Sequence, residues 1–276
     1  MELNPLLGKV KLPGRVFQLP SKGLFYEPTV LAETVKNGEV QVKPMSALAE
    51  MKLRSADLLY SGKVLREICS ECVPEILKPE QLLTKDVDAL FSFLRVVTYG
   101  SLLRINSTHS CEKAESHEYE INLDPFLADP KNAILDHKDT IYRVTLSNEQ
   151  IVNTKPPTYE AAMTIVMLRQ EISRMENNNA PIDDMILEKI MITDLLSVIK
   201  NVETDTAEGT HVIVADQKQI GQWLRALTKP ILNELYDGVK KTDVWGYEFK
   251  AKLRCKDCQA EYVHNLELDP INFFFG

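Results

Sequence analysis

Three short motifs occur twice along this chain, in the same order, and they constrain its fold more than any other feature. Each set begins with Lys-Pro and a hydroxyl residue, continues to a cysteine and ends with Leu-Asp-Pro. The pairs are Lys43-Pro44-x-Ser46 and Lys155-Pro156-x-Thr158, Cys111 and Cys255, and Leu123-Asp124-Pro125 and Leu268-Asp269-Pro270. Motifs that recur in a fixed order indicate an internal repeat. We therefore interpret the chain as an internal duplication; the alternative is that strand–helix–hairpin units recur by chance.

Secondary-structure signals follow the same order in both copies. The first copy opens with strands at 30–35 and 39–42 around Asn37-Gly38, a dipeptide that supplies the positive φ angles of a tight hairpin turn. Apolar periodicity then predicts helices over about 46–60, 61–73 and 86–99, followed by strands at about 102–106 and 118–123. The second copy predicts strands at about 141–146 and 150–152, helices over about 159–176, 182–200 and from Asp216, and strands at about 247–253 and 261–268.

These patterns predict an α+β fold with two related lobes, each made of a β-hairpin, helices and a C-terminal β-hairpin. Residues 1–29 are expected to form an irregular N-terminal arm, because four prolines exclude a long helix there. The arm either contacts a partner or covers the core of the chain itself. The first lobe is expected over 30–140. The second, over 141–276, would carry a Cys-x-x-Cys hairpin and an aromatic C-terminal tail.

Composition limits the classes of partner. The net charge of −8 argues against broad contact with nucleic acid phosphates and with anionic membranes. No apolar stretch approaches the length of a membrane span, and the first 20 residues do not have the pattern of a signal peptide. We therefore expect a soluble protein that is not secreted. Its five cysteines then indicate reduced thiols or a metal site rather than a disulfide framework.

The sequence motifs of common enzymes are missing. There is no phosphate-binding loop, dinucleotide-binding glycine pattern, nucleophile elbow or H-E-x-x-H zinc motif. We therefore expect no catalysis, no cofactor and no small-molecule substrate. Because active sites are assembled in space, an unrecognised enzyme remains an alternative, and a polar cleft with perturbed carboxylates would reveal it.

The sharpest local signal is Cys255-Lys256-Asp257-Cys258, between two predicted strands. This spacing aims two thiolates at one point and can hold zinc, which needs two further ligands. Candidates are Cys111, His109 and His117, which the duplication places at the tip of the other hairpin. The alternative is an eroded metal loop without an ion, and we favour it because Ala114 stands where the first copy needs its second cysteine. Cys69 and Cys72 have the same spacing but fall on an apolar helical stripe, where core thiols are the better interpretation.

Three phenylalanines stand near the C-terminus: Phe273, Phe274 and Phe275. Exposed on a tail, they would promote aggregation. We expect them to be covered, either by this chain or by a partner, and they are our candidate partner contacts.

Several motifs, taken in order, resemble a known family. They are Leu19-Pro20-Ser21-Lys22-Gly23 with Tyr26, Gly38-Glu39-Val40, Lys43-Pro44-Met45-Ser46, Ser61-Gly62-Lys63-Val64-Leu65, Leu82-Leu83-x-x-Asp86, Leu94-Arg95-x-x-x-Tyr99-Gly100 and the terminal Phe-Phe run. This order resembles that of the baseplate hub and hub-assembly proteins of T-even-type bacteriophages. The resemblance covers most of the first half and the C-terminus.

The resemblance implies a non-enzymatic structural or chaperone-like protein of the phage tail baseplate hub. Its partners would be other hub or tail assembly proteins, met in the host cytoplasm during assembly and, for a hub subunit, retained in the virion tail. The sequence leaves open whether the chain is a hub subunit or a transient assembly factor. The alternative function is a zinc-ribbon regulatory or nucleic-acid adaptor protein, which a basic face around the Cys255 hairpin would favour.

Overall fold

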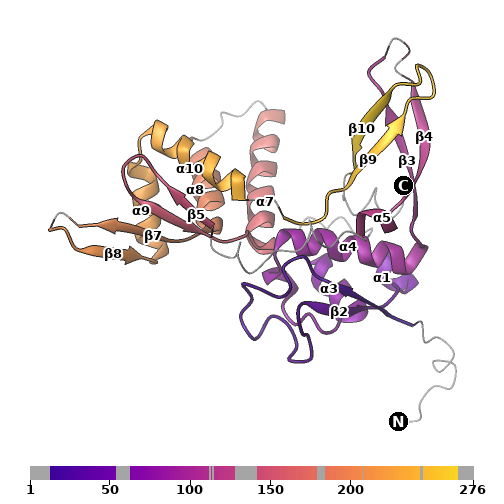
Figure 1. Cartoon of the computed structure of the whole chain (residues 1–276), viewed down its shortest axis with the longest axis horizontal. Coiled ribbons are helices and arrows are strands. Elements are labelled where there is room, and N and C mark those ends of the chain that lie inside the picture. The colour runs from indigo at the N-terminus through magenta and orange to yellow at the C-terminus, as the bar shows by residue number, and fades with distance from the viewer. Residues whose placement is uncertain are drawn as a thin grey trace. The chain divides into compact units, whose positions relative to one another are not determined.

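The computed structural model describes residues 13–53, 63–111, 113, 115–127, 142–178, 184–206, 208–242 and 245–266. The chain, coloured by residue number in Figure 1, divides into two compact units. The first unit comprises Met1–Pro79, Lys85–Ile134 and Gly246–Gly276, and the second comprises Glu80–Thr84 and Leu135–Trp245. The larger part of the second unit, Leu135–Trp245, is therefore an insertion between two segments of the first.

The first unit begins with a strand where the sequence predicted an irregular arm. Strand β1 (Arg15–Gln18) pairs antiparallel with β2 (Glu39–Val42). The predicted partner of β2 at 30–35 was wrong: the described backbone there forms turns and one isolated bridge from Leu31 to Ile76. Asn37 and Gly38 do have positive φ angles. However, Phe17 of β1 stacks on Phe93 at 4.3 Å between ring centroids, which recruits the earlier segment to the core.

Three helices form the core of the first unit: α1 (Ala47–Leu53), α3 (Val64–Cys72) and α4 (Thr84–Tyr99). A short 3₁₀ turn, η2 (Pro79–Gln81), precedes α4. Ser46 Oγ accepts a hydrogen bond from the Ala49 backbone N–H at 3.1 Å, as expected of an N-cap. Helix α4 is buried over most of its circumference, so it serves as the central helix of this unit.

A buried carboxylate ties the N-terminal segment to α4. Asp86 is fully buried and accepts hydrogen bonds from the Ser21 backbone N–H at 2.9 Å, from Ser21 Oγ and from Tyr26 Oη at 2.5 Å. Burial raises the pKa of Asp86 to about 6, although these hydrogen bonds act in the opposite direction. The arm that the sequence predicted is thus attached to this unit from β1 onward, and Leu19 and Ser21 lie in its buried interior.

Two β-hairpins complete the first unit. Strands β3 (Leu102–Thr108) and β4 (Ser116–Asn122) pair antiparallel, and α5 (Asp124–Leu127) follows them. Strands β9 (Lys250–Arg254) and β10 (Glu261–Asn265) pair in the same way. Figure 1 shows the two hairpins side by side. The sequence placed the second hairpin in a lobe of residues 141–276, whereas here it clusters with the first unit.

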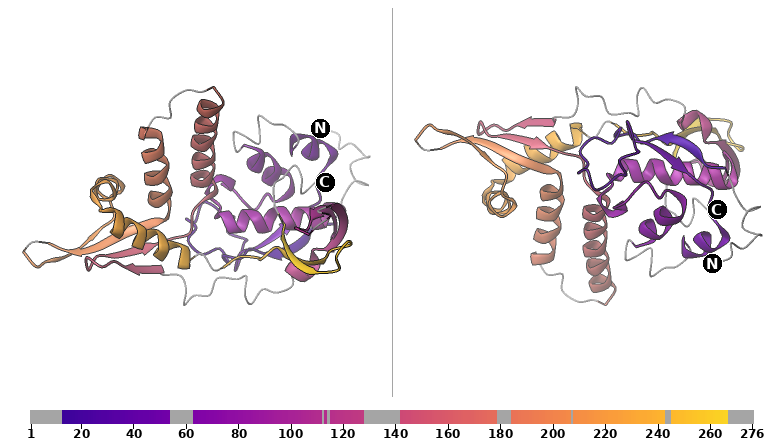
Figure 2. Two further views of the ribbon diagram at one scale, coloured as in Figure 1. Left: turned by 90° about the horizontal axis from the view of Figure 1, so that it is seen from above. Right: turned by 90° about the horizontal axis from the view of Figure 1, so that it is seen from below.

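The second unit contains an antiparallel sheet in the order β5-β6-β7-β8. Its strands are β5 (Tyr142–Thr145), β6 (Ile151–Thr154), β7 (Ile199–Asp205) and β8 (His211–Val214). Its helices are α7 (Tyr159–Asn177), α8 (Asp184–Val198), α9 (Gln217–Ala226) and α10 (Lys229–Thr242). Helices α7 and α8 pack on each other, as Figure 2 also shows.

The core of the second unit is apolar and lies between its sheet and helices. Its buried members are Val144, Leu146, Val152, Ile192, Leu195, Ile199, Val202, Ile220, Leu224 and Leu235. Helix α10 approaches β5 so closely that a Cβ on Gly238 would lie 2.3 Å from Val144 Cγ1. A side chain at position 238 would therefore force the helix off the sheet.

The mixed fold of helices with small antiparallel sheets agrees with the predicted α+β class. Strands β7 and β8 were not predicted, because the sequence was interpreted as a helix to residue 200 and an insertion at 203–209. Among the described residues, no helix is both long and apolar enough to cross a membrane. Predictions for residues 1–12, 54–62, 267–276 and Ala114 lie outside the part of the chain that the structure describes.

Candidate metal centre at the paired hairpins

The tips of the two hairpins bring four metal-binding side chains together. His109 and Cys111 follow the end of β3, and Cys255 and Cys258 occupy the turn between β9 and β10. The ligand atoms of these four residues all lie within 4.8 Å of one another. The two cysteines of the C-x-x-C motif thus meet two of the three candidate ligands that the duplication placed at the tip of the other hairpin.

The individual distances suit a tetrahedral ion. Cys111 Sγ lies 3.9 Å from Cys255 Sγ, and His109 Nδ1 lies 3.3 Å from Cys258 Sγ. Around a tetrahedral zinc with Zn–S bonds of about 2.3 Å, neighbouring ligand atoms are separated by about 3.8 Å. The donor set of three thiols and one imidazole is also a known structural zinc combination. These four residues can therefore hold a metal.

At the tip of the β9–β10 hairpin, the backbone forms a tight turn around Cys255. The Cys255 N–H donates to the Ala260 carbonyl at 2.9 Å, and the Gln259 N–H donates to the Cys255 carbonyl at 3.1 Å. Gln259 has a φ of 62°, in the left-handed region that such a tight turn requires. The backbone N–H groups of Cys258 and Asp257 also point at the Cys255 thiol and lower its pKa to about 7. The turn thus favours the thiolate, which is the form that binds metals.

His117, the third candidate ligand, lies in a neighbouring cluster with Glu115 and Asp257. Its Nε2 is 2.7 Å from Asp257 Oδ2, which joins the two hairpins across their tips. The sequence did not single out Asp257 or Glu115. Asp257 lies inside the C-x-x-C turn, but the sequence left open whether the two tips meet, so no signal paired it with His117.

Further polar and aromatic contacts connect the facing sides of the two hairpins. Ser107 Oγ accepts a hydrogen bond from Tyr262 Oη at 3.0 Å and lies 2.9 Å from His264 Nδ1. The His109 ring packs against the Tyr262 ring, with 4.8 Å between centroids. Lys256 Nζ donates to the Glu118 carbonyl at 2.8 Å. The side chains that meet near the tips are thus largely polar or aromatic.

The other cysteine pair with this spacing lies in the apolar core rather than at a turn. Cys69 and Cys72 are fully buried on α3. Burial raises the pKa of Cys72 to about 12, so this thiol remains protonated and unreactive at neutral pH. These two residues are core side chains, as their place on an apolar stripe indicated.

A pocket in the second unit is lined by described side chains of limited chemical variety. A cavity of about 150 Å³ is lined by Tyr142, Thr154, Lys155, Pro156, Pro157, Val198, Val239, Lys240 and Trp245. None of these lining residues is a carboxylate, a histidine or a cysteine. The cavity therefore lacks the carboxylates, imidazoles and thiols from which acid–base and nucleophilic sites are most often built, and its titratable side chains are Tyr142, Lys155 and Lys240.

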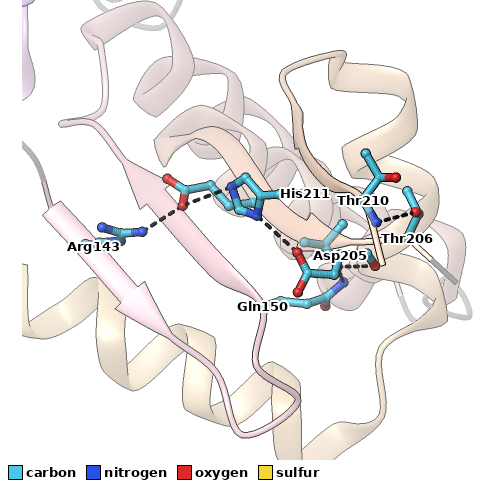
Figure 3. Close-up of polar contacts among 8 residues, drawn as sticks. Arg143, Gln150, Asp205, Thr206, Thr210 and His211 are labelled. Atoms are coloured by element: carbon cyan, nitrogen blue, oxygen red, sulfur yellow. Dashed lines mark hydrogen bonds and ion pairs between the residues drawn. The ribbon is translucent and has the colours of Figure 1, made fainter. Parts of the chain in front are cut away.

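A polar network on the four-stranded sheet is a further cluster of charged groups (Figure 3). Arg143 Nη2 lies 2.7 Å from Glu203 Oε2, and His211 Nδ1 lies 3.1 Å from Asp205 Oδ1. Gln150 Nε2 donates to Thr204 Oγ1 at 3.3 Å, which adds a contact between neighbouring strands. The Arg143 and His211 side chains are more than half exposed. Cross-strand pairs of this kind support strand register, and we assign the network no chemistry.

Comparison with known proteins identifies a family. A family model described as "T4 bacteriophage base plate protein" matches residues 27–276. No match was found among curated proteins or among solved structures.

Proposed function

The chain belongs to the T4 bacteriophage base plate protein family, and from this we propose that it is a structural or assembly protein of the tail baseplate hub that acts through protein contacts, without catalysis. The observation that carries the proposal is the extent of the family match, which spans residues 27–276 and therefore covers both units. Its partners would be other hub or tail assembly proteins. A chaperone-like role in the host cytoplasm and a place in the finished tail are both compatible with this proposal.

Exposed apolar side chains on α7 and α8 support a role in protein contacts. Met167 and Val166 on α7 are 53% and 40% exposed, and Met185 and Leu187 on α8 are 73% and 48% exposed. Only Ile165 and Leu168 are buried along the 19 residues of α7. Clusters of exposed apolar side chains favour association with another protein. These exposed positions on α7 and α8 are therefore candidate contacts of the chain with the hub.

The two ends of the chain supply further candidate contacts. Phe273, Phe274 and Phe275 lie outside the described residues, and we propose that they are covered by a partner. Of the expected N-terminal arm, residues 15–18 already pair with β2 and Leu19 is buried. Partner contacts of the arm are thus assigned mainly to its first 12 residues.

Matching local geometry supports the proposed duplication. After β2, the Lys43 N–H donates to the Cys72 carbonyl at the end of α3; after β6, the Lys155 N–H donates to the Val198 carbonyl at the end of α8. Thr158 caps α7 as Ser46 caps α1. On this proposal β7 and β8 are an insertion in the second copy, and the paired hairpins are the two copies of one element.

The alternative function, an adaptor for nucleic acid, finds little support in the charges around the Cys255 hairpin. The exposed face of β9 carries Lys250, Lys252 and Arg254. Lys250 is paired with Glu248 at 3.4 Å and Arg254 with Glu261 at 3.0 Å. A short and largely neutralised row is not the basic patch that phosphate binding needs.

The proposal is tested by mass spectrometry of purified phage particles beside infected-cell lysate. A hub subunit should be recovered in the particles at a fixed ratio to the other hub proteins. A transient assembly factor should appear in the lysate only, bound to hub proteins. Absence of hub proteins from both the particles and the complexes isolated with this chain would overturn the proposal.

A matched pair of variants tests the contact surfaces. Met167→Glu on the exposed face of α7 should leave a folded protein that no longer supports particle assembly. Lys218→Glu, on an exposed position of α9, is the control and should assemble normally. Normal assembly with the Met167 variant would remove α7 from the proposed contact surface.

A further inference from the structure

We propose that His109, Cys111, Cys255 and Cys258 bind one structural zinc ion that joins the two hairpins of the first unit. The inference goes beyond the proposed baseplate role and does not depend on it. It rests on the four ligand atoms that converge within 4.8 Å. The absence of a second cysteine at Ala114 does not exclude the site, because His109 supplies the fourth donor.

The donor chemistry selects zinc among the common divalent ions. Magnesium and calcium prefer hard oxygen ligands, and none is present in the four-residue set. Thiolates with one imidazole in a tetrahedral arrangement suit zinc. All four coordination positions are filled by protein atoms, which is typical of a structural rather than a catalytic zinc.

The other contacts between the hairpin tips are polar or aromatic, and buried apolar packing is sparse near the tip of the first hairpin. In the first hairpin the paired buried apolar residues, Leu103 and Ile121, lie at the base. Toward the tip the buried residue of β3 is Ser107, and the most buried of the four ligands is Cys255 itself. An isolated two-stranded hairpin is marginally stable in water. A metal at the tips supplies the cross-link that apolar packing supplies elsewhere in the chain.

The position of the site along the chain gives the zinc a second consequence. One pair of ligands precedes the main segment of the second unit, Leu135–Trp245, and the other pair follows it, so Cys111 and Cys255 are 144 positions apart in the sequence. The ion therefore fixes together the two segments of the first unit between which the second unit is inserted. Loss of zinc releases the C-terminal hairpin from the rest of the first unit.

The contact between His117 and Asp257 provides an internal control. It joins the same two tips at 2.7 Å, but His117 lies outside the four-residue set. Replacing His117 should weaken the hairpin contact without removing a ligand. His109 and His117 thus form a matched histidine pair, and Cys258 and the buried Cys72 form a matched cysteine pair.

The experiment measures zinc in the full chain, purified without a polyhistidine tag or chelator in reducing buffer. Elemental analysis should find one zinc per wild-type chain. Cys258→Ser and His109→Asn should each lose most of it, whereas Cys72→Ala and His117→Asn should retain it. Replacing zinc with Co²⁺ in the wild type should give the visible absorption of a tetrahedral thiolate site, which needs no variant to fold.

Two outcomes overturn the inference. One is a wild-type protein without zinc that also fails to bind added Zn²⁺ or Co²⁺ stoichiometrically, including the case in which the thiols are found as a disulfide. The other is retention of full zinc by the double variant Cys258→Ser with His109→Asn, which would place the metal elsewhere. Particle assembly is not part of the readout, so failure here is distinct from failure of the proposed function.

Discussion

The paired hairpins of the first unit and the four-stranded sheet of the second unit both consist of antiparallel strands, but different interactions stabilise them. Behind the sheet lie ten buried apolar residues drawn from strands and helices. Near the hairpin tips, the contacts between strands β3–β4 and β9–β10 are mainly hydrogen bonds, aromatic contacts and converging thiols. One region is stabilised by burial of apolar surface, and in the other we propose that zinc supplies a cross-link.

This difference determines which kind of change would destabilise each region. Burial stabilises a sheet through many small contributions, so it resists the loss of any one polar contact. A metal concentrates the stabilisation in four ligand atoms, so a chelator or a single substitution removes it. The comparison makes predictions that separate the two regions.

Zinc removal should have the largest effect. Structural zinc contributes about 10–16 kcal/mol to the folding of small zinc-binding peptides, and we expect several kcal/mol here. Excess chelator should lower the thermal midpoint of the first unit and leave that of the second unit unchanged. Differential scanning calorimetry with and without chelator measures both transitions. Equal shifts in the two units would contradict the comparison.

A cavity in the core of the second unit should have the next largest effect. Leu195 on α8 is 1% exposed, and Leu195→Ala should cost about 2–5 kcal/mol. Leu187 on the same helix is 48% exposed, and Leu187→Ala should cost less than about 0.5 kcal/mol. Urea unfolding of both variants gives these values. Neither variant should change the zinc content, so a loss of zinc in Leu195→Ala would show that the two regions are coupled.

The buried carboxylate of the first unit should make a smaller contribution that depends on pH. The raised pKa of Asp86, about 6, means that between about pH 4 and pH 6 the folded state holds a proton that the unfolded state has released. Stability from this group is therefore full below about pH 4 and lost as the pH rises through about 6, with a total near 3 kcal/mol. The difference in unfolding free energy between wild type and Asp86→Asn, followed with pH, isolates this contribution. A difference that does not change between pH 4 and 7 would refute it.

The exposed network of the sheet should have the smallest effect. Arg143 lies 2.7 Å from Glu203, but its side chain is 53% exposed. Arg143→Gln should therefore cost less than about 1 kcal/mol, and the cost should shrink at high salt. Urea unfolding at low and high salt checks both statements. A larger, salt-independent cost would mean that the sheet depends on this ion pair more than on its apolar core.

Much of the fold was predictable because local patterns and packing agree there. Helices α3, α4 and α7 were expected near their observed positions, since each combines apolar periodicity with clear ends. The C-x-x-C hairpin and its candidate ligands were also expected, because the motif is short and sits between two strand patterns. The repeated motifs matched Cys111 to Cys255 at the tips of two hairpins but left open whether these tips meet.

The remainder depends on contacts that are distant in sequence. Strand β7 follows α8 at Ile199 without an intervening glycine or proline, so nothing marked the change from helix to strand. Strand β1 was missed because stacking of Phe17 on Phe93 recruits it, and prolines on both sides of the segment indicated an irregular arm. The pairing of Asp257 with His117 joins residues 140 positions apart, which no local pattern reveals.

Hydrogen–deuterium exchange with and without chelator tests the central comparison most directly. We predict that zinc removal abolishes protection of backbone amides in β3, β4, β9 and β10, while β5 to β8 exchange at unchanged rates. The Cys258→Ser variant should reproduce the chelated pattern without chelator, and His117→Asn should not. Unchanged protection of the four hairpin strands in the zinc-free protein would contradict the account, because apolar packing would then suffice to hold them.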